Sequence, residues 1–368
     1  MTRVSRTGHV VWSSGMGFSR IRTGSASIRA SIFLMDYKLT SLSAVLERAD
    51  SRLRSPDGGV RLWPTGFPLL DDAIGGGFRS GTLNLVAGPQ GQGKTMFALQ
   101  AARAAVRSGR SAVFFSYELE ADALTQRLVA MEGGEIDAYE APSLSEVRGI
   151  FEGTTGGAGG LLERMAATPN GIGTQALVNV SEFADRMVVH RSTATHTDIT
   201  EINDTIKKVM GSTGESPLIV VDYLQKVAMP LSELGEEERI TRITEQLKDV
   251  AIEFDAPVLA VAAMDHEGLE PGARMRTRHM RGSTALSYEP DVVLILGTKS
   301  DLVARHHLMY GGVNAESFKD WSVITVEKNR SGSGGAEIEF RKRFEQGRFD
   351  PNGNVVTEKL VDERVYVE

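Results

Sequence analysis

Short apolar runs recur along most of the chain, and each ends where polar or glycine residues begin. The runs that indicate buried strands are Thr82–Ala87, Ala112–Tyr117, Met187–His190, Leu218–Asp222, Pro257–Val261, Pro290–Leu296 and Trp321–Val326. Apolar runs without polar alternation are typical of strands that are covered on both faces, as in the parallel sheets of α/β proteins.

Segments with helical spacing stand between these runs. Apolar residues recur every three or four positions over Met96–Val106 and Ala121–Glu132, in the segment that Asp198 caps, and from Glu236 onward. The alternation predicts an α/β fold with a largely parallel central sheet flanked by helices.

An amphipathic helix is expected before this domain, within residues 37–58. Its apolar positions are Leu39, Leu42, Val45, Leu46, Ala49 and Leu53, and Pro56-Asp57-Gly58-Gly59 ends it. A single helix must bury its apolar stripe, either on its own core or on a neighbouring subunit.

The remaining boundaries follow from composition. Residues 1–36 carry five arginines (Arg3, Arg6, Arg20, Arg22 and Arg29) and no acidic residue before Asp36. They indicate a disordered basic arm or an upstream extension, with an organelle transit peptide as the alternative. Residues 59–350 form the main domain, with a Gly-rich insertion at about 150–186, and residues 351–368 are expected to be a peripheral tail.

Composition narrows the class of protein. The 368 residues are 41% hydrophobic and 24% charged, which is ordinary for a globular domain, and no apolar stretch is long enough to cross a bilayer. The absence of cysteine excludes disulfides and thiolate chemistry. A net charge of −7 argues against a surface that coats nucleic acid, but it leaves room for a local basic groove.

One stretch carries recognisable chemistry. Between a predicted strand and a predicted helix stand Gly88, Pro89, Gln90, Gly91, Gln92, Gly93, Lys94 and Thr95, the P-loop pattern. Glycines let the loop curl so that backbone N–H groups and the helix N-terminus face phosphate oxygens. Lys94 can reach the β- and γ-phosphates, and the Thr95 hydroxyl can ligate Mg²⁺. The blander alternative is a glycine-rich turn in a chain that has 39 glycines.

Two carboxylates end predicted strands. Glu118 follows the second strand, where a carboxylate can orient the water that attacks the γ-phosphate, whereas Glu120 fits an ordinary helix N-terminal acid. Asp222 ends the apolar run Leu218–Asp222 and can deliver one carboxylate to a Mg²⁺ shell.

These motifs, taken together, resemble a known family. The RecA-like ATPase domain of the DnaB-type replicative helicases is resembled by Thr65-Gly66-Phe67, the Leu70-Asp71 pair, the P-loop and above all Asp222-Tyr223-Leu224-Gln225. The resemblance runs from about Ser41 to Phe349. It implies a RecA-like P-loop NTPase core that is preceded by a linker helix and ends in a β-hairpin.

The resemblance also implies residue roles. Ser116-Tyr117-Glu118-Leu119 matches the family segment whose glutamate is the catalytic base. Lys328 and Arg330 match a hairpin that donates a cationic finger to the neighbouring subunit's ATP, although a basic β-turn is the simpler explanation. Ala263 stands where the family has a sensor glutamine, so Asp265 or His266 substitutes for it, or the coupling of ATP to DNA is weak.

A basic cluster stands out in this acidic chain. By resemblance, Arg274, Arg276, Arg278 and Arg281, with His279 among them, occupy a channel loop that contacts DNA phosphates without sequence specificity. A solvated basic loop is the alternative. The other channel loop, between Gln225 and Arg239, is acidic.

The function implied by the resemblance is that of an ATP-dependent DNA helicase without the N-terminal collar of the replicative enzymes. It would form a hexameric ring, hydrolyse ATP with Mg²⁺ at subunit interfaces, and move on single-stranded DNA in the cytoplasm of a bacterial or phage-type host, with no membrane partner. The alternative is a RecA- or KaiC-like oligomeric ATPase with a regulatory role. A binding protein without turnover would need neither Glu118 nor Arg330.

Overall fold

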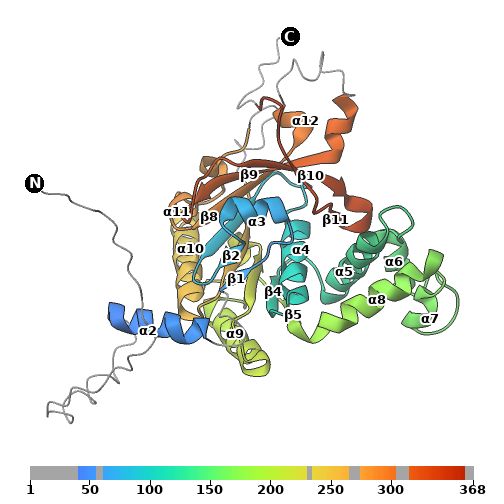
Figure 1. Cartoon of the computed structure of the whole chain (residues 1–368), viewed down its shortest axis with the longest axis horizontal. Coiled ribbons are helices and arrows are strands. Elements are labelled where there is room, and N and C mark those ends of the chain that lie inside the picture. Colours follow the sequence, from blue (N-terminus) through green and yellow to red (C-terminus); the bar gives the residue numbers. More distant parts are fainter. Residues whose placement is uncertain (1–39, 55–60, 230–233, 265–273, 304–314, 361–368) are drawn as a thin grey trace, which may run out of the picture. The chain divides into compact units, whose positions relative to one another are not determined.

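The computed structural model of the chain describes residues 40–54, 61–229, 234–264, 274–303 and 315–360 (Figure 1). It divides into two units, residues 1–60 and 61–368, and each is described by itself. The expected basic arm of residues 1–36 lies outside the described residues, as do Asp265 and His266.

The first unit contributes one described helix, α2 (Leu42–Leu53). The Ser41 hydroxyl caps it by accepting a hydrogen bond from the Ala44 N–H at 3.2 Å. None of its residues is buried. The predicted amphipathic helix is therefore present over these residues, while the ends of the expected range 37–58 lie outside the described part.

The second unit is built on a ten-stranded sheet in the order β11-β10-β9-β8-β3-β7-β6-β4-β5, with β12 paired to β10. Strands β3 to β8 are mutually parallel, and β9 to β12 are antiparallel to their neighbours. The strands are β3 (Leu83–Ala87), β4 (Ala112–Ser116), β5 (Met187–Arg191), β6 (Leu218–Asp222), β7 (Val258–Ala262), β8 (Val292–Thr298), β9 (Trp321–Asn329), β10 (Glu337–Arg343), β11 (Arg348–Phe349) and β12 (Asn354–Val355). The predicted mostly parallel α/β sheet is confirmed.

Alternation along the central strands builds two cores. Val86 packs into one apolar cluster, whereas Leu85 and Ala87 pack into the other, because successive side chains of a strand point to opposite faces. Helices cover both faces, so both sets of side chains are buried. This is why the central strands are continuous apolar runs in the sequence.

The helices of one face contribute Phe97, Leu128 and Val180, and those of the other contribute Ile206 and Leu247. The first group is α4 (Lys94–Arg107), α5 (Ala121–Ile136), α6 (Leu144–Phe151), α7 (Leu161–Met165) and α8 (Ile172–Phe183). The second group is α9 (Ile199–Thr213) and α10 (Glu236–Glu253). Figure 1 shows α5 to α8 gathered on one side of the second unit. Shorter elements are β1 (Leu62–Trp63), β2 (Phe78–Arg79), α3 (Pro68–Ile74), α11 (Ala285–Tyr288) and α12 (Lys299–Leu302).

The Gly-rich insertion is a folded loop between helices. After α6 the chain turns through glycines, and the Arg164 guanidinium of α7 donates hydrogen bonds to the carbonyls of Gly159 at 3.0 Å and Thr155 at 2.9 Å. The arginine thus supplies the donors that a loop without regular secondary structure lacks. The remainder of the expected range, up to residue 186, is largely α8.

The C-terminal residues expected to be a peripheral tail are attached to the sheet. We call residues 351–360 the C-terminal strap, because β12 adds to the sheet beside β10 and Leu360 forms a bridge with Val303. Within the strap, Glu358 lies 2.8 Å from the Nζ atom of the buried Lys299, which also contacts Glu339 at 2.5 Å. The strap residues lie at the surface, and backbone pairing with β10 and the ion pair of Glu358 with Lys299 attach them to the domain. No helix in the described ranges is long and apolar enough to span a membrane.

Candidate nucleotide-binding site

The P-loop connects β3 to α4 at the edge where the parallel strands end, which we call the carboxyl edge of the sheet. Gly93 has a φ of +86°, and a Cβ atom added there would lie 2.8 Å from the Cζ atom of Phe349. Only glycine meets both conditions without strain. The loop therefore turns directly into the N-terminus of α4, which begins at Lys94.

A cavity of about 570 Å³ opens at this edge, a volume in the range of small-ligand sites. Six parts of the chain line it: the P-loop with the start of α4, the end of β4, α5, the end of β6, the end of β7, and the turn at Phe344. Ligands of parallel α/β sheets bind at this edge, because the loops that follow the strands converge there.

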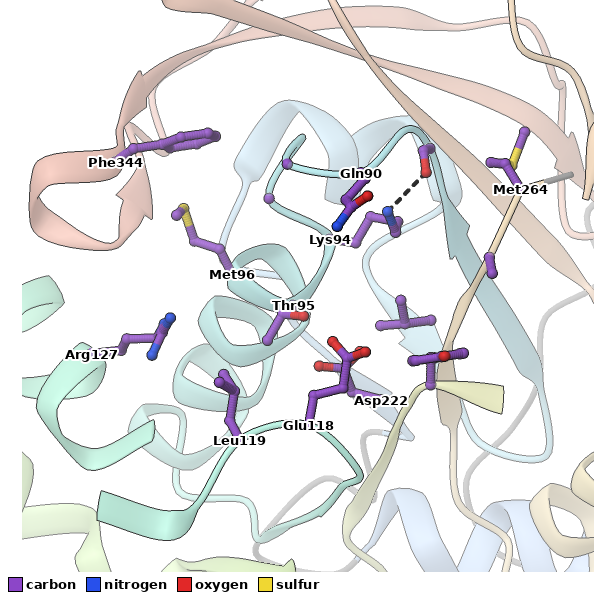
Figure 2. A pocket seen from close by; sticks show the side chains of 16 residues that line it. Gln90, Lys94, Thr95, Met96, Glu118, Leu119, Arg127, Asp222, Met264 and Phe344 are labelled. Carbon is purple, nitrogen blue, oxygen red and sulfur yellow. Dashed lines mark hydrogen bonds between the residues drawn. The ribbon is translucent and has the colours of Figure 1, made fainter. Parts of the chain in front are cut away.

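Lys94 lies inside the curl of the loop. Its ammonium donates hydrogen bonds of 2.8 Å to the carbonyls of Gly88 and Pro89, and Figure 2 shows the first of them. Burial lowers the pKa of Lys94 from its ordinary value, and the charges of Asp222 and Glu118 oppose that shift. The cation is thus placed where phosphate oxygens would lie on the loop.

The two predicted carboxylates meet in the cavity. Figure 2 shows Glu118 and Asp222 with their carboxylates close to each other and to Thr95. Asp222 is 1% exposed, whereas Glu118 is exposed to the cavity. Burial raises the pKa of Asp222 to about 6; a hydrogen bond with Thr95 lowers it, and the charge of Glu118 raises it.

The same residues fit a magnesium ion. The Oδ2 atom of Asp222 is buried and has no hydrogen-bond partner among the described residues. This oxygen can therefore act as a ligand for a cation beside the Thr95 hydroxyl. Across those residues no three His, Asp or Glu side chains form a metal-binding group of their own. A hard cation that takes its other ligands from phosphates and water suits such a site.

Arg127 and Phe344 are among the lining residues that the sequence reasoning did not single out. Arg127, on α5, donates a hydrogen bond of 3.2 Å to the Ala123 carbonyl, and Figure 2 shows it near Met96, with Phe344 on the same side of the cavity. Burial lowers the pKa of Arg127, and the charge of Arg148 lowers it further, while that of Asp222 opposes. The signal for Arg127 is a lone cation in the helix that follows the Glu118 strand; Phe344 has no local signal.

Lys328 and Arg330 lie at the opposite, amino edge of the sheet. Neighbouring Asn329 pairs with Val292, the first residue of β8, and β8 runs parallel to β3 toward the P-loop. Lys328 donates to the carbonyls of Ser287 and Tyr288 at 2.9 and 2.7 Å, and Arg330 donates to the Tyr288 carbonyl at 2.5 Å. The structure therefore does not bring these two cations to the chain's own P-loop.

The predicted basic cluster is largely paired with acids. Arg274 is 7% exposed and forms an ion pair with Glu337 on β10, so it is a buried structural cation and not a surface contact for phosphates. Arg276 pairs with Glu327 in the same way. Acids on β9 and β10 thus pair with these two arginines, and the predicted contact of Arg274 and Arg276 with DNA stays a prediction.

Two members of the cluster remain at the surface. Arg278 is exposed and its Nε atom lies 3.1 Å from the Nε2 atom of His279. Arg281 is also exposed and pairs with Glu236 on α10 at 2.9 Å. The loop that precedes them, residues 265–273, lies outside the described part of the chain.

Comparisons with known proteins agree on one family. The profile described as "DnaB-like helicase C terminal domain" matches residues 63–148 and 170–350, which is more than half of the chain. A replicative DNA helicase DnaB of Rhodothermus marinus is 27% identical over 284 residues, covering 74% of this chain and 27% of that protein. A replicative DNA helicase DnaB of Pasteurella multocida is 25% identical over 317 residues, covering 84% of this chain and 61% of that protein.

The fold is also found in solved structures. One of them, an ATPase domain, superposes with a TM-score of 0.64 at 19% identity, covering 84% of this chain and 98% of that one. A DnaB-like replicative helicase, solved with attention to its interactions with primase, gives a TM-score of 0.62 at 18% identity, covering 84% of this chain and 68% of that one. The chain spans between about a quarter and three fifths of the curated relatives just described. On the family match and the P-loop cavity together, the chain belongs to the DnaB-like helicase C-terminal domain family.

Proposed function

We propose that this domain hydrolyses ATP with Mg²⁺ and serves as the motor of a helicase that moves on single-stranded DNA. The observation that carries the proposal is the cavity in which Lys94, Thr95, Asp222 and Glu118 converge at the carboxyl edge of a RecA-like sheet. Binding alone needs the loop and its lysine; an exposed carboxylate beside a buried one suits hydrolysis.

Each side chain has a role in this proposal. Lys94 and the loop bind the phosphates, and Thr95 with Asp222 would hold Mg²⁺, which neutralises charge on the phosphates when bound. Glu118 orients a water molecule, accepts its proton as the water oxygen attacks the γ-phosphorus, and the bond to the β-phosphate oxygen breaks to release ADP. Arg127 is a further cation that lines the same cavity.

The position of Arg330 supports hydrolysis between subunits. A guanidinium at the amino edge cannot serve the nucleotide at the carboxyl edge of the same sheet, but it can serve that of a neighbour stacked head to tail. Such interfaces close into rings when the rotation permits. We therefore propose a homo-oligomeric ring, hexameric by family resemblance, in which Arg330 is the finger and Lys328 holds its base.

DNA contact is proposed for the exposed part of the basic cluster, Arg278 and Arg281. Phosphate contacts require accessible positive charge, and the side chains of these two are exposed, although Arg281 pairs with Glu236; Arg274 is buried and Arg276 is half-buried.

The test is the steady-state ATPase rate with and without a single-stranded oligothymidine, at about 50 and about 200 mM salt, because phosphate contacts weaken steeply with salt. A large, salt-sensitive stimulation that is lost in the Arg278→Ala/Arg281→Ala variant supports the proposal. Lys207→Ala/Lys208→Ala, which removes two exposed cations of α9, is the matched control and should keep the stimulation. If the oligonucleotide neither stimulates hydrolysis nor binds, translocation on DNA is refuted, and the protein is an oligomeric ATPase that acts on another partner.

A further inference from the structure

Gln225, the last residue of the Asp-Tyr-Leu-Gln motif, has a hydrogen-bonding pattern that the proposed chemistry does not use. Its side chain is buried among the ends of β6, β7 and the segment that leads to α11. The Oε1 atom accepts a hydrogen bond of 3.0 Å from the Ala263 N–H. The Nε2 atom donates to the Arg281 carbonyl at 3.0 Å and to the Ala263 carbonyl at 3.4 Å.

On the side away from the nucleotide cavity, these hydrogen bonds lead to arginine residues. The Arg281 N–H donates to the Ala263 carbonyl at 2.9 Å, so Gln225, Ala263 and Arg281 form one closed set of hydrogen bonds. Arg239, on α10, donates to the Gln225 carbonyl at 3.0 Å. A second cavity of about 430 Å³ is lined by Gln225, Lys226, Arg239 and Arg281, together with Glu236, the ion-pair partner of Arg281.

On their other side, the residues bonded to Gln225 border the nucleotide cavity. Tyr223 and Ala263 line both cavities, so the two spaces share a wall. Ala263 presents a methyl group there, and its side chain can make no hydrogen bond to a phosphate. The backbone of residue 263 is nevertheless held on both its N–H and its C=O by a side chain that begins three residues after Asp222.

We propose that Gln225 is the positioning residue that transmits the state of the γ-phosphate site to the Arg281 segment, in place of a side chain at residue 263. A displacement of the β6 or β7 end that accompanies nucleotide binding shifts the amide group, and the amide group shifts Arg281 with it. The inference deepens the proposed function and rests on it for the identity of the ligand that Arg281 contacts.

Two substitutions separate the hydrogen bonds from the packing. Gln225→Met keeps the side-chain volume and loses every bond of the amide. Gln225→Glu keeps the acceptor for the Ala263 N–H but places carboxylate oxygens against the carbonyls of Ala263 and Arg281, so it serves as a second variant if the first does not fold. Gln100→Met is the matched control, because the buried Gln100 amide likewise bonds both backbone groups of one residue, Phe349, at 3.0 Å each.

The direct test is hydrogen exchange of the backbone amides at residues 277–288, with and without Mg²⁺ and the slowly hydrolysed analogue ATPγS. In the unmodified chain the analogue should slow exchange at Arg281. In Gln225→Met, the factor by which the analogue slows exchange at Arg281 should be smaller by about fivefold or more, in line with ordinary coupling energies. In Gln100→Met this factor should be unchanged. Retention of the slowing in both Gln225 variants, or no slowing in the unmodified chain, would overturn the inference.

A second readout separates this inference from the proposed function. If oligothymidine stimulates the unmodified chain and Gln225→Met by the same factor, the inference fails and the helicase proposal stands. If exchange responds to the analogue through Gln225 but DNA neither binds nor stimulates, the helicase proposal fails and the internal link stands.

Discussion

Glu118 and Asp222 are the same kind of group in the same cavity, but their surroundings differ. Asp222 is buried at the end of a central strand, with one oxygen that lacks a described partner, whereas Glu118 is open to the cavity. A buried carboxylate without a partner favours a bound cation, and an accessible one can meet a water molecule.

We expect Glu118→Gln to bind ATP as tightly as the unmodified chain while its turnover falls by about 10² to 10⁴-fold, the usual contribution of a general base. Binding is measured with a fluorescent nucleotide and turnover by phosphate release. Unchanged turnover would remove the assignment of Glu118 as the base.

Gly93 and Gly91 offer a matched pair of substitutions in the P-loop. Both have left-handed φ angles, +86° and +79°, but a Cβ atom at Gly91 meets nothing within 4 Å, while one at Gly93 meets the ring of Phe349. We expect Gly91→Ala to cost about 1 kcal/mol of unfolding free energy from backbone strain and Gly93→Ala to cost clearly more. Denaturant unfolding without nucleotide measures both costs. Equal losses would show that contact with Phe349 does not matter.

The site could be predicted in part because its chemistry is local in the sequence. Lys94, Thr95 and Asp222 each stand in a short pattern whose context, a strand that ends at the carboxyl edge, is also local. Phe344 joins the site through contacts between distant segments, which no spacing rule encodes, and the same holds for the bonds of Gln225 to Ala263 and Arg281. The pairing within the basic cluster could not be predicted for the same reason, since the acids that contact Arg274 and Arg276 lie on β9 and β10.

At the scale of elements, the C-terminal strap is connected to the P-loop through the side chains of two consecutive residues, Thr298 and Lys299. Thr298, at the end of β8, donates a hydrogen bond of 2.7 Å to the Gln92 side chain of the P-loop. The next residue is Lys299, which the strap holds through Glu358. The strap thus fixes the strand end against which one side of the P-loop rests.

A chain that ends after Asp350 should unfold at a lower temperature and bind nucleotide several-fold more weakly than a chain that ends after Leu360. Loss of Glu358 leaves the buried Lys299 with fewer partners and frees the end of β8, at a cost of at least about 1 kcal/mol. Thermal unfolding and nucleotide titration of the two chains check this. Identical melting and affinity would show that the strap only rests on the sheet.

The same comparison has a pH dependence. Burial alone would raise the pKa of Glu358, but its hydrogen bond and charge interaction with Lys299 outweigh burial and hold that pKa below its ordinary value of 4.5. A carboxyl group with a lowered pKa in the folded state stabilises above that ordinary value, and the stabilisation is lost as the pH falls below it. The difference in melting temperature between the two chains should therefore shrink below about pH 4.5.

Some strands of this fold can be predicted from their hydrophobic pattern, and others cannot. The central strands are buried on both faces, so continuous apolar residues are obligatory and visible. The two-residue strands β1, β2, β11 and β12 are too short to show any periodicity, and β12 exists because β10 offers it free backbone groups. The attachment of the tail could not be predicted because its partner, Lys299, belongs to a different stretch of the chain.

At the scale of the whole molecule, the P-loop and Arg330 occupy opposite edges of one sheet. A face-to-face dimer with twofold symmetry joins a patch to its own copy, so it cannot join one edge to the other. Head-to-tail stacking can, and every interface then combines a pocket from one subunit with a finger from the next.

Two inactive variants should consequently restore activity when they are mixed. Arg330→Ala keeps the pocket and Lys94→Ala keeps the finger, so in random head-to-tail assemblies about a quarter of the interfaces combine both intact halves, and about that share of turnover should return. Arg330→Ala alone should bind nucleotide but hydrolyse little. Mixing Arg330→Ala with the Arg330→Ala/Lys94→Ala double variant is the control and should restore nothing. Normal hydrolysis by Arg330→Ala alone would exclude the finger.

The proposed head-to-tail assembly, with Arg330 as the finger, has a genetic consequence. An allele that damages one edge disables one site for each faulty copy, whereas an allele that damages both edges disables the copy's own site and that of its neighbour. Consider a cell that expresses the allele with both edges damaged beside the intact gene. Each faulty copy in a mixed assembly would inactivate two sites, so activity would fall by more than the share of faulty copies and the defect would be dominant.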